Sequence, residues 1–353
     1  MKAHIAILPG DGIGPEVTTE AVRCLRAIAT RFGHAFDMTE APVGAAAMEA
    51  GLSPLPKATL QLAMACDAVL FGAIGSPRFN DPSATKRPEQ AILGLRRALG
   101  LYANLRPVKP FASLMHASPL RAELLENVDF VVVRELTGGI YFGRRQREKD
   151  FAIDECRYSV AEIERITRIA GRLARARRRK VTSVDKANVL ETSRLWRQVV
   201  TRVMAEEFSD VQLEHQLVDS VAMLLLTRAA TFDVILTENL FGDILSDEAA
   251  ALAGSLGLLP SASLGEGTQG LYEPIHGSAP DIAGQGVANP YGAIASVAML
   301  LRHSLLLSSE AAALEAALAA AISADSLTRD IARSGVAGIS TRAAGDAVLR
   351  RLG

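Results

Sequence analysis

Short apolar runs alternate along the chain with longer segments in which apolar residues recur every three or four positions. The short runs predict buried strands, and the longer segments predict amphipathic helices. Strands are expected at His4–Leu8, Ala68–Phe71, Val128–Val133, Val181–Val184, Gln212–Val218 and Val234–Thr237. Helices are expected at Glu16–Phe32, Pro56–Met64, Pro88–Leu99, Val160–Arg178, Thr192–Glu207 and Glu310–Ile322. This alternation is typical of an α/β fold.

The helix expected at Val160–Arg178 carries signals at both of its ends. Ser159 and Glu162 have the spacing of a capping box, in which each side chain accepts a hydrogen bond from the other residue's backbone N–H. At the other end, a basic cluster comprises Arg175, Arg177, Arg178, Arg179 and Lys180. We favour the interpretation that these cations complement the helix dipole. RNA binding is the alternative, and it requires an affinity that falls as salt rises.

The composition is that of a globular protein with a large core. With 353 residues, the chain is long enough for two domain-sized lobes. Its 38 basic and 39 acidic residues nearly balance, so we expect neither nucleic acid nor a membrane as a partner. The apolar stretches near 221–226 and 294–307 are interrupted by Arg228, Arg302 and His303, and neither reaches the roughly 20 apolar residues that a bilayer needs.

Two further features lead us to expect a cytoplasmic location. The first residues lead directly into a strand-like run, without the pattern of a signal peptide. Cys24, Cys66 and Cys156 are widely spaced and have no metal-binding spacing. We therefore expect buried, reduced thiols.

The segment after the first strand is rich in glycine. Gly10, Gly12 and Gly14 precede Pro15 and Glu16, which predicts a tight strand-to-helix turn with proline in the first helical turn. A Rossmann dinucleotide site is not expected here. The glycines lack the G-x-G-x-x-G spacing, and no acidic residue ends a second strand about 20 residues later.

Residues 134–143, with the sequence RELTGGIYFG, form the most informative stretch of the chain. A buried strand delivers the cation of Arg134 and the phenol of Tyr141 into a backbone that is tight enough to need glycine. The alternative is that Arg134 and Glu135 form an ion pair and that Tyr141 is a core aromatic residue.

Two carboxylates, Asp243 and Asp247, stand four positions apart. On a helical turn this spacing places both on one face, where like charges repel unless a cation binds between them. Hard carboxylate oxygens favour Mg²⁺ or Mn²⁺. The alternative is that one aspartate caps the helix and the other is exposed to solvent.

Lysine and arginine side chains provide further candidate chemistry. Lys186 lies between a predicted strand and a predicted helix. An ordinary lysine has a pKa of about 10.4, and burial beside other cations would make it a better base by lowering its pKa. The alternative is an ion pair with Asp185. Arg96 and Arg106 carry planar guanidinium groups that suit paired carboxylates.

Several segments together resemble one known family. Their sequences are LPGDGIGPE at 8–16, RELTGGIYFG at 134–143, VDKANVLE at 184–191, NLFGDILSD at 239–247 and EPIHGSAPDIAG at 273–284. The resemblance covers nearly the whole chain. It is to the 3-isopropylmalate dehydrogenases, within the isocitrate/isopropylmalate dehydrogenase family of β-hydroxyacid oxidative decarboxylases.

The resemblance implies a two-lobed α/β fold that is not a Rossmann fold, with the active site in the cleft between the lobes. Residues 1–101 and 256–353 are expected to form a cofactor-side lobe that contains both termini. Residues 102–255 are expected to form a central lobe that carries a dimer interface.

The resemblance also implies a homodimer with shared active sites. The catalytic residues would be Tyr141 and Lys186, and Arg96, Arg106 and Arg134 would grip the malate carboxylates. The metal ligands would be Asp219, which also faces the substrate, with Asp243 and Asp247. In the family, the counterparts of Lys186 and Asp219 come from the partner subunit. Leu217 stands where most relatives have tyrosine, a departure that concerns the local packing and not the carboxylate.

The cofactor implied by the resemblance is NAD⁺. A carboxylate at Asp281 accepts hydrogen bonds from free ribose hydroxyls but repels the 2′-phosphate of NADP⁺. NADP-dependent relatives carry basic and aromatic residues at positions 281 and 282. The loop Ser76–Glu89 resembles a second cofactor-contacting loop. The full set of expected cofactor contacts is Ile13, Ser76, Glu89, Glu273, His276, Gly277, Ser278, Ala279, Asp281, Ile282 and Asn289.

The substituent pocket distinguishes substrates that share a malate core. By resemblance its walls are Ile92, Leu93, Leu136 and Val189, although residues of these types also suit an ordinary core. An apolar lining disfavours a carboxylate and favours an isopropyl group by about 0.8 kcal/mol per buried CH₂. This predicts NAD-dependent oxidative decarboxylation of (2R,3S)-3-isopropylmalate to 4-methyl-2-oxopentanoate and CO₂, a step of leucine biosynthesis.

Two alternatives stay open. A paralogue acting on D-malate or another 3-substituted malate would share the same chemistry, because one extra methylene is weakly discriminated. A non-catalytic ligand-binding homologue would usually lack a catalytic lysine or tyrosine or a metal aspartate, and all of these are present here.

Overall fold

The computed structural model describes residues 1–81 and 84–353, which divide into two compact units. Unit 1 comprises Met1–Leu101, Phe111–Ala117 and Ala253–Gly353, and unit 2 comprises Tyr102–Pro110 and Ser118–Leu252. These limits differ from the expected ones at Phe111–Ala117 and at residues 253–255. Within unit 1, a Cβ atom on Gly254 would lie 2.8 Å from the Cβ of Ala117, which shows how closely these two segments pack.

Unit 1 is built on a mostly parallel sheet with the strand order β2-β1-β3-β12-β11. Strands β1, β2, β3 and β12 run parallel, and β11 pairs with β12 in the antiparallel sense. All six residues of β3 are buried, as expected for an inner strand covered on both faces. The strands are β1 (Lys2–Gly10), β2 (Ala35–Glu40), β3 (Ala68–Ala73), β11 (Pro260–Leu264) and β12 (Gly270–Pro274).

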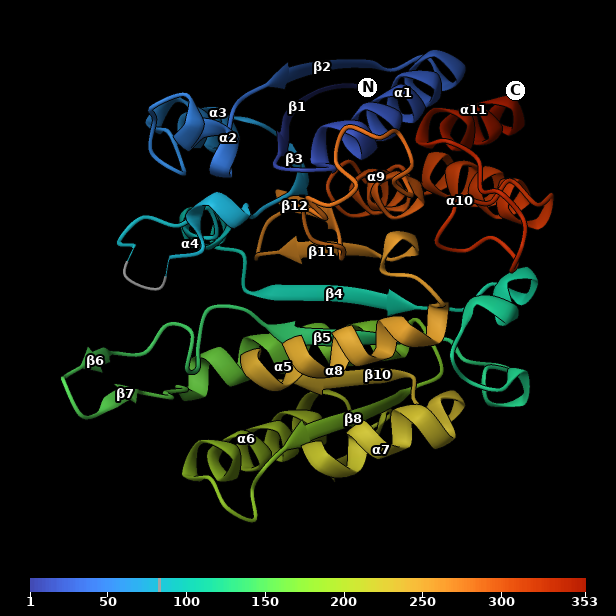
Figure 1. The fold of residues 1–353 in the computed structure, drawn as a ribbon. Helices are drawn as coiled ribbons and strands as arrows, with labels where there is room; N and C mark the ends of the chain where they lie inside the picture. Colours follow the sequence, from blue (N-terminus) through green and yellow to red (C-terminus); the bar gives the residue numbers. More distant parts are fainter. Residues whose placement is uncertain (82–83) are drawn as a thin grey trace. The chain divides into compact units, whose positions relative to one another are not determined.

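Helices cover both faces of this sheet (Figure 1). One group lies on one side of β1, β3 and β12, and consists of α2 (Gly44–Glu49), α3 (Lys57–Ala65) and α4 (Gln90–Ala98). The other group consists of α1 (Gly14–Phe32), α9 (Tyr291–His303), α10 (Ser308–Ser323) and α11 (Thr341–Leu352). Beneath the first group, Leu8 and Phe71 belong to an apolar core with Ile92 and Leu95 of α4. The alternating buried residues of the strands therefore supply two cores, one to each helical layer.

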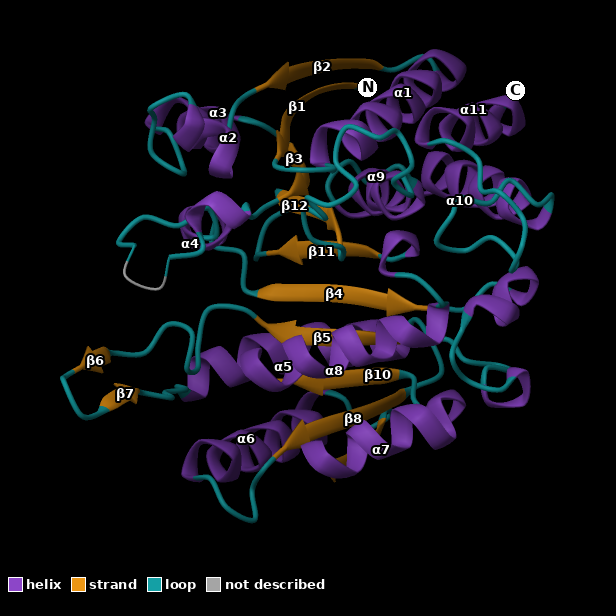
Figure 2. Cartoon of the chain, viewed as in Figure 1, coloured by secondary structure: helices purple, strands orange, loops and turns teal. Residues whose placement is uncertain are grey.

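In unit 2 the strand order is β4-β5-β10-β8-β9, and Figure 2 labels β4, β5, β10 and β8. Strands β5, β10, β8 and β9 run parallel, and β4 is antiparallel to β5. The strands are β4 (Ala103–Val108), β5 (Phe130–Glu135), β8 (Lys180–Asp185), β9 (Gln212–Leu217) and β10 (Val234–Thr237). The helices are α5 (Val160–Arg175), α6 (Glu191–Glu207), α7 (Val218–Arg228) and α8 (Asn239–Ala250). A separate small hairpin pairs β6 (Arg145–Arg147) with β7 (Ala152–Asp154).

Two adjacent residues at the end of β5 show that α5 and α8 lie on opposite faces of this sheet. The side chain of Arg134 contacts Asp243 of α8, whereas that of Glu135 accepts a hydrogen bond from Arg165 of α5 at 3.0 Å. Successive side chains of a strand point to opposite faces. The alternative in which Arg134 and Glu135 pair with each other is therefore wrong.

The strands and helices predicted from the pattern are all present, with shifted ends. The strand predicted at Gln212–Val218 ends at Leu217, because Val218 begins α7. The helix predicted to reach Arg178 ends at Arg175. The turn after Gly10 is confirmed, with proline in the first turn of α1. The pattern missed β2, β4, β6, β7, β11, β12, α2, α7, α8, α9 and α11.

The capping box predicted at the start of α5 is confirmed: Ser159 and Glu162 bond to each other's backbone N–H groups. Carboxylates engage the basic cluster beyond the other end of this helix. Arg177 lies 2.7 Å from Asp129 and 2.8 Å from Asp233, and Arg175 lies 2.5 Å from Asp210. These ion pairs tie the end of α5 to neighbouring segments of unit 2.

No helix in residues 1–81 and 84–353 is long and apolar enough to cross a membrane. The three cysteines are free thiols, and Cys24 and Cys66 are buried as expected. The expectation of a buried thiol is wrong for Cys156, which is only half-buried. It follows the surface hairpin β6–β7 in the sequence and does not belong to a strand of the sheet.

The capping box generates a stability prediction. Replacing Ser159 by alanine removes the acceptor for the Glu162 N–H, so Ser159→Ala should lower the free energy of unfolding by about 1 kcal/mol. The single tryptophan, Trp196, is 1% exposed in unit 2 and provides a fluorescence probe for urea unfolding. Val160→Ala, at an exposed position of the same helical turn, is the matched control and should change stability much less. Equal effects of the two substitutions would contradict a capping role for Ser159.

Candidate active site

The candidate residues of unit 2 lie at the carboxyl ends of its parallel strands. Arg134 is the last residue but one of β5, Lys186 follows β8, Asp219 lies just beyond β9, and Asn239 follows β10 after one residue. In parallel α/β sheets these ends share one edge, and ligands bind outside it. The order of the strands thus brings together segments that are far apart in the sequence.

At this edge, two arginines and a tyrosine surround the carboxylates of α8. Arg134 donates to Asp243, and the Tyr141 hydroxyl donates to the other oxygen of the same carboxylate at 2.8 Å. Arg106 of β4 donates to Asp247 at 2.9 Å and lies 3.7 Å from Asp243. Five of the predicted site residues therefore form one cluster of compensated charges.

The amide of Asn239 holds Arg134 in place. Its Oδ1 accepts from the Arg134 Nε at 3.1 Å and from Nη2 at 2.8 Å, while its Nδ2 donates to the Gly138 carbonyl at 3.1 Å. The Asn239 backbone N–H donates to the Tyr158 hydroxyl at 2.9 Å. Sequence reasoning assigned no role to Asn239 or Tyr158, although Asn239 stands in the segment that matches the family.

The close packing of Tyr158 explains the paired glycines before Tyr141. A Cβ atom on Gly138 would lie 2.6 Å from the Tyr158 ring, and one on Gly139 would lie 2.3 Å from the Tyr158 hydroxyl. Gly139 also has a φ of +74°, a conformation that favours glycine. The glycine pair therefore lets the loop lie against Tyr158 and deliver Tyr141 to Asp243.

The phenol of Tyr141 is held in its protonated form. Partial burial and then the hydrogen bond to Asp243 raise the pKa of Tyr141 above its ordinary value. The guanidinium carbon of Arg134 lies 5.8 Å from the centre of the Tyr141 ring. Tyr141 is half-buried. It is thus a protonated group at the sheet edge and not a core aromatic residue.

Lys186 and Asp219 form a separate pair at the same edge. The Lys186 Nζ donates to Asp219 at 2.5 Å, and this hydrogen bond lowers the pKa of Asp219. Asp185 instead pairs with Arg197 at 2.8 Å, so the alternative of an ion pair between Asp185 and Lys186 is wrong. Within the described ranges, no three His, Cys, Asp or Glu side chains are grouped to hold a metal. Asp219 therefore does not form a three-carboxylate group with Asp243 and Asp247 of the same chain.

The residues expected to line an apolar pocket have different surroundings. Leu136 follows β5 and is 1% exposed, and Ile92 is buried in unit 1. Leu93, also in α4, is half-buried and packs against the same core. Val189 follows β8 and is 61% exposed, so it does not belong to the core of unit 2.

The expected cofactor residues of unit 1 also lie at or after the carboxyl ends of parallel strands, namely β1, β3 and β12. The Ile13 N–H donates to the Ser278 carbonyl at 2.8 Å. The buried carboxylate of Asp11 accepts from the N–H groups of Ala45, Ala46 and Gly75 at 2.9, 2.8 and 2.8 Å. These contacts join the loops after β1, β3 and β12 at one end of the unit 1 sheet.

Within the second expected cofactor loop, Ser76–Glu89, residues 82–83 lie outside the described residues. Ser76 caps a short 3-10 helix, Pro77–Phe79, by accepting from the Arg78 N–H at 3.4 Å. Glu89 is the residue before α4. The loop therefore joins the end of β3 to the helix that carries Ile92, Leu93 and Arg96.

Within unit 1, Glu273 and Arg96 pair with each other at 3.0 Å. The Nε atom of Arg96 is buried and has no hydrogen-bond partner in the described part of the chain. The same is true of the Nε2 atom of His276. Burial lowers the pKa of His276, which favours a neutral ring. Buried polar atoms without partners are rare, so both atoms fit positions that accept a ligand.

Asn289 is buried, and both polar atoms of its side chain are already engaged. Its Nδ2 donates to Asp330 at 3.0 Å, and its Oδ1 accepts from the Tyr291 N–H at 3.0 Å. Asp281 and Gly277, in contrast, are exposed, whereas Ser278 is buried and Ala279 and Ile282 are half-buried. The loop thus presents some residues to solvent and uses others to hold its own shape.

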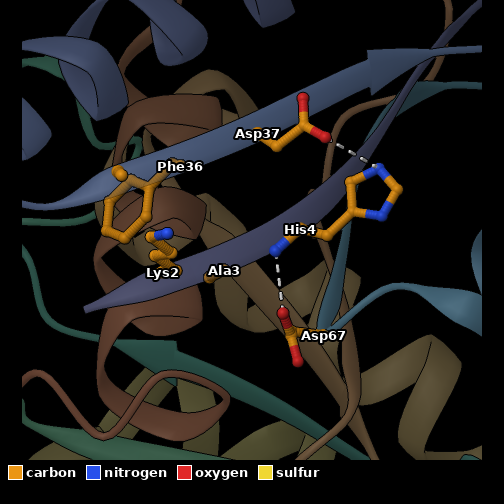
Figure 3. Close-up of a pocket in the computed structure, with 7 residues that line it drawn as sticks. Lys2, Ala3, His4, Phe36, Asp37 and Asp67 are labelled. Carbon is orange, nitrogen blue, oxygen red and sulfur yellow. Dashed lines mark hydrogen bonds and ion pairs between the residues drawn. The ribbon is translucent and has the colours of Figure 1, made fainter.

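A surface depression of about 610 Å³ in unit 1 lies away from these loops (Figure 3). Its lining residues include Lys2 and His4 of β1, Phe36 and Asp37 of β2, and Asp67, which precedes β3. The His4 N–H donates to Asp67 at 2.7 Å, and its ring lies 3.9 Å from Asp37. The depression is at the opposite end of the strands from the candidate residues and contributes nothing to their site.

Comparison with known proteins agrees with the resemblance read from the sequence. The family model described as isocitrate/isopropylmalate dehydrogenase matches residues 4–348. The chain belongs to this family. A 3-isopropylmalate dehydrogenase from Anaeromyxobacter dehalogenans is 54% identical to this chain, and the match covers 100% of each protein. One from Bacillus subtilis is 53% identical, with 95% of this chain and 93% of that protein covered.

Solved structures of the isocitrate/isopropylmalate dehydrogenase family have the same fold. The crystal structure of an isocitrate dehydrogenase from Methylococcus capsulatus matches with a TM-score of 0.88 and 35% identity, over 99% of each chain. A β-decarboxylating dehydrogenase from Thermococcus kodakarensis matches with a TM-score of 0.79 and 37% identity, over 99% of this chain and 96% of that one. The expected family and fold are confirmed.

A buried carboxyl group at the start of α8 generates a pH-dependence prediction. Glu238 is 5% exposed, and its carboxyl group accepts a hydrogen bond from the Ser193 hydroxyl at 3.4 Å. Burial and then the nearby Asp185 charge raise the pKa of Glu238 from 4.5 to about 7, although the Ser193 hydrogen bond opposes them. Because the folded-state pKa is the higher one, the stability from the neutral carboxyl is present below pH 4.5 and is lost as pH rises through about 7.

Glu238→Gln mimics the neutral form at every pH. Relative to the wild type, its free energy of unfolding should therefore improve by on the order of 3 kcal/mol between about pH 4.5 and about pH 8. Urea unfolding followed by Trp196 fluorescence at several pH values would measure this change. A difference between the two proteins that does not vary with pH would show that Glu238 does not titrate in this range.

Proposed function

We propose that this protein is an NAD⁺-dependent 3-isopropylmalate dehydrogenase of leucine biosynthesis. It would convert (2R,3S)-3-isopropylmalate to 4-methyl-2-oxopentanoate and CO₂. The observation that carries the proposal is the cluster of Arg106, Arg134, Tyr141, Asp243 and Asp247. It combines two cations that suit substrate carboxylates, a proton donor, and two carboxylates that suit a metal ion. Relatives named as 3-isopropylmalate dehydrogenases, more than half identical over the whole chain, support the substrate.

The malate carboxylates are proposed to bind the arginines. Arg106 and Arg134 are each less than one-tenth exposed, and their guanidinium groups form planar forks that suit carboxylates. Arg96 joins them in the proposal through the resemblance, and its buried Nε without a partner among the described residues supports a role in anion binding. These contacts orient the C2 and C3 carbons of the substrate.

Asp243 and Asp247 are proposed to hold Mg²⁺ or Mn²⁺ together with Asp219 of a second copy. The donors fit such an ion, since all are carboxylates and two share one face of α8. When bound, the cation supplies a Lewis acid for the C2 oxygen and NAD⁺ supplies the hydride acceptor.

The proton transfers are assigned to two side chains. Lys186 would accept the C2 hydroxyl proton during oxidation, directly or through water. Loss of the C3 carboxylate leaves an enolate, and the positive charges of Arg106 and Arg134 stabilise it. Tyr141, whose pKa is raised and which is therefore protonated, would then deliver a proton to C3.

The cofactor is proposed to be NAD⁺, bound by the loops of unit 1. The close approach of Ile13 to Ser278 and the buried His276 Nε2, which has no partner among the described residues, fit a site for a nucleotide with polar edges. The exposed carboxylate of Asp281 suits ribose hydroxyls and disfavours a 2′-phosphate. Since both Asn289 side-chain atoms are engaged, its contact with the adenine is proposed through its backbone.

A homodimer with shared sites is proposed from the exposed face of α7. Asp219, Met223 and Leu226 recur at the helical spacing that places them on one face, and all three are exposed, Met223 by 60%. On α8, which packs against α7, Ile244 is 57% exposed beside Asp243. Covering this apolar surface with a second copy would carry Asp219 and Lys186 into the partner's site. A cytoplasmic location stays a prediction.

The substrate panel is the first experiment for the proposal. NADH or NADPH formation with Mg²⁺ would be measured for 3-isopropylmalate, D-malate, isocitrate and longer alkylmalates. We expect kcat/KM to be highest for 3-isopropylmalate with NAD⁺, because the side chains proposed to line the substituent pocket are apolar. A higher value for D-malate or a bulkier malate would favour a paralogue, and binding without turnover would favour a non-catalytic homologue.

Shared sites generate a complementation prediction. Lys186→Met and Tyr141→Phe should each lower kcat by on the order of 10²-fold or more, because each removes a proton-transfer group. In a mixed dimer of the two variants, one site would lose both groups and the other would keep both. After joint unfolding and refolding, activity should therefore recover to about a quarter of the wild-type value.

The control is a mixture of each variant with itself, treated in the same way, which should stay inactive. Circular dichroism would establish that both variants refold. Mixtures that stay inactive, although mixed dimers are present by mass spectrometry, would contradict shared sites. Retained activity of either variant alone would show that the proton-transfer role is misassigned.

A further inference from the structure

The segment that carries Asp281 and Ile282 is stabilised by hydrogen bonds within itself. The Ile282 N–H donates to the Ala279 carbonyl at 3.1 Å, and the Gln285 N–H donates to the Ile282 carbonyl at 3.2 Å. The Gln285 side chain donates to the Asp281 carbonyl at 2.8 Å. These bonds fold the segment into consecutive turns, but they do not fix its position on the rest of unit 1.

Contacts from the start of α1 help to fix that position, and the Thr341 N–H at the start of α11 also donates to the Gly286 carbonyl at 2.8 Å. Before the turns, the Ile13 N–H donates to the Ser278 carbonyl at 2.8 Å. After them, the Glu16 carboxylate accepts from the Gly284 N–H at 2.5 Å with one oxygen and from the Gly286 N–H at 3.0 Å with the other. The segment from Ser278 to Gly286 is therefore held at both ends by α1 and the turn before it.

The backbone around these contacts is adapted to them. Gly284 and Gly286 have φ angles of +77° and +65°, which favour glycine and turn both N–H groups toward one acceptor. A Cβ atom on Gly12 would lie 1.9 Å from the Ser278 carbonyl oxygen, so this approach also requires glycine. Glu16 lies in the first turn of α1, where the helix dipole stabilises a negative charge.

We propose that Glu16 is a positioning residue for the cofactor. Its carboxylate fixes the turn that presents Asp281 and Ile282, and thereby sets the affinity for the adenosine half of the dinucleotide and the preference for NAD⁺ over NADP⁺. The inference rests on the proposed function, because it requires that this loop bind the nucleotide. Glu16 itself does not contact the reacting atoms.

The chemistry of the side chain makes the inference specific. A carboxylate offers an acceptor to each of the two glycine N–H groups, and such charge-assisted hydrogen bonds are strong. A glutamine offers one carbonyl oxygen and an NH₂ group, which would face the second N–H as a donor against a donor. Glu16→Gln therefore loosens the Gly284–Gly286 end of the turn, which the Thr341 N–H still holds at the Gly286 carbonyl, while nearly preserving the size of the side chain.

The test compares Glu16→Gln with the wild type and with Glu40→Gln. Glu40 is an exposed carboxylate at the end of β2, so the control removes the same charge from the same unit. AMP binding would be measured by calorimetry, because AMP contains the adenosine half alone. We expect the Kd for AMP and the KM for NAD⁺ to rise by on the order of tenfold in Glu16→Gln, the equivalent of one charge-assisted hydrogen bond.

A merely structural role would not produce the same pattern. We expect kcat and the KM for 3-isopropylmalate to change by less than about twofold, and the preference for NAD⁺ over NADP⁺ to fall. Hydrogen exchange of the backbone across residues 276–286 should accelerate in Glu16→Gln without ligand, and not in Glu40→Gln. This readout does not depend on turnover.

AMP binding within about twofold of the wild type, in a folded Glu16→Gln protein, would overturn the inference and leave the proposed function intact. Failure of the wild type to bind AMP or NAD⁺ would overturn the proposed cofactor and this inference together. Should Glu16→Gln lower the Tm markedly, Glu16→Asp serves as the second variant. It keeps the charge but is one methylene too short to reach both amides, and unchanged AMP affinity there would equally overturn the inference.

Discussion

The need to compensate the buried charge of Arg134 determines most of the architecture of the unit 2 site. The residue is 3% exposed, and a guanidinium at such depth without partners would destabilise the fold by several kcal/mol. Asp243 supplies the opposite charge and Asn239 supplies a neutral acceptor. Gly242 leaves room for the Arg134 side chain, because a Cβ atom at position 242 would lie 2.7 Å from the Arg134 Cγ. The order Asn-x-x-Gly-Asp on α8 thus follows from one arginine on β5.

The same compensation gives the site its proposed reactivity. In the structure, the negative charges of Asp243 and Asp247 are balanced by arginines. A dicarboxylate substrate would bring its own negative charges to those arginines, which leaves the two aspartates available to a cation. Substrate and metal binding would then favour each other, since each compensates the charges that the other leaves without a partner.

Sequence patterns revealed the elements with a clear period and missed the others for physical reasons. Strand β4 contains Asn104, Arg106 and Pro107 among its six residues, so its sequence does not predict a strand. Helix α9 is buried on nearly every side and has no polar face that would reveal a helical period. The pairing of Lys186 with Asp219 was also beyond sequence reasoning. It depends on β8 and β9 being neighbours, which is a property of strand order.

Sequence reasoning also did not find the backbone contacts of several acidic residues near the candidate sites, because it did not consider the needs of the loops. Asp11, Glu16 and Glu135 each accept hydrogen bonds from two or three backbone N–H groups of turns beside these sites. Loop amides at a sheet edge have no ladder partner, and an unpaired buried N–H is costly. A carboxylate satisfies several of them at once. An acidic residue in a glycine-rich motif therefore has a second explanation besides ligand binding, and only the direction of its side chain distinguishes the two.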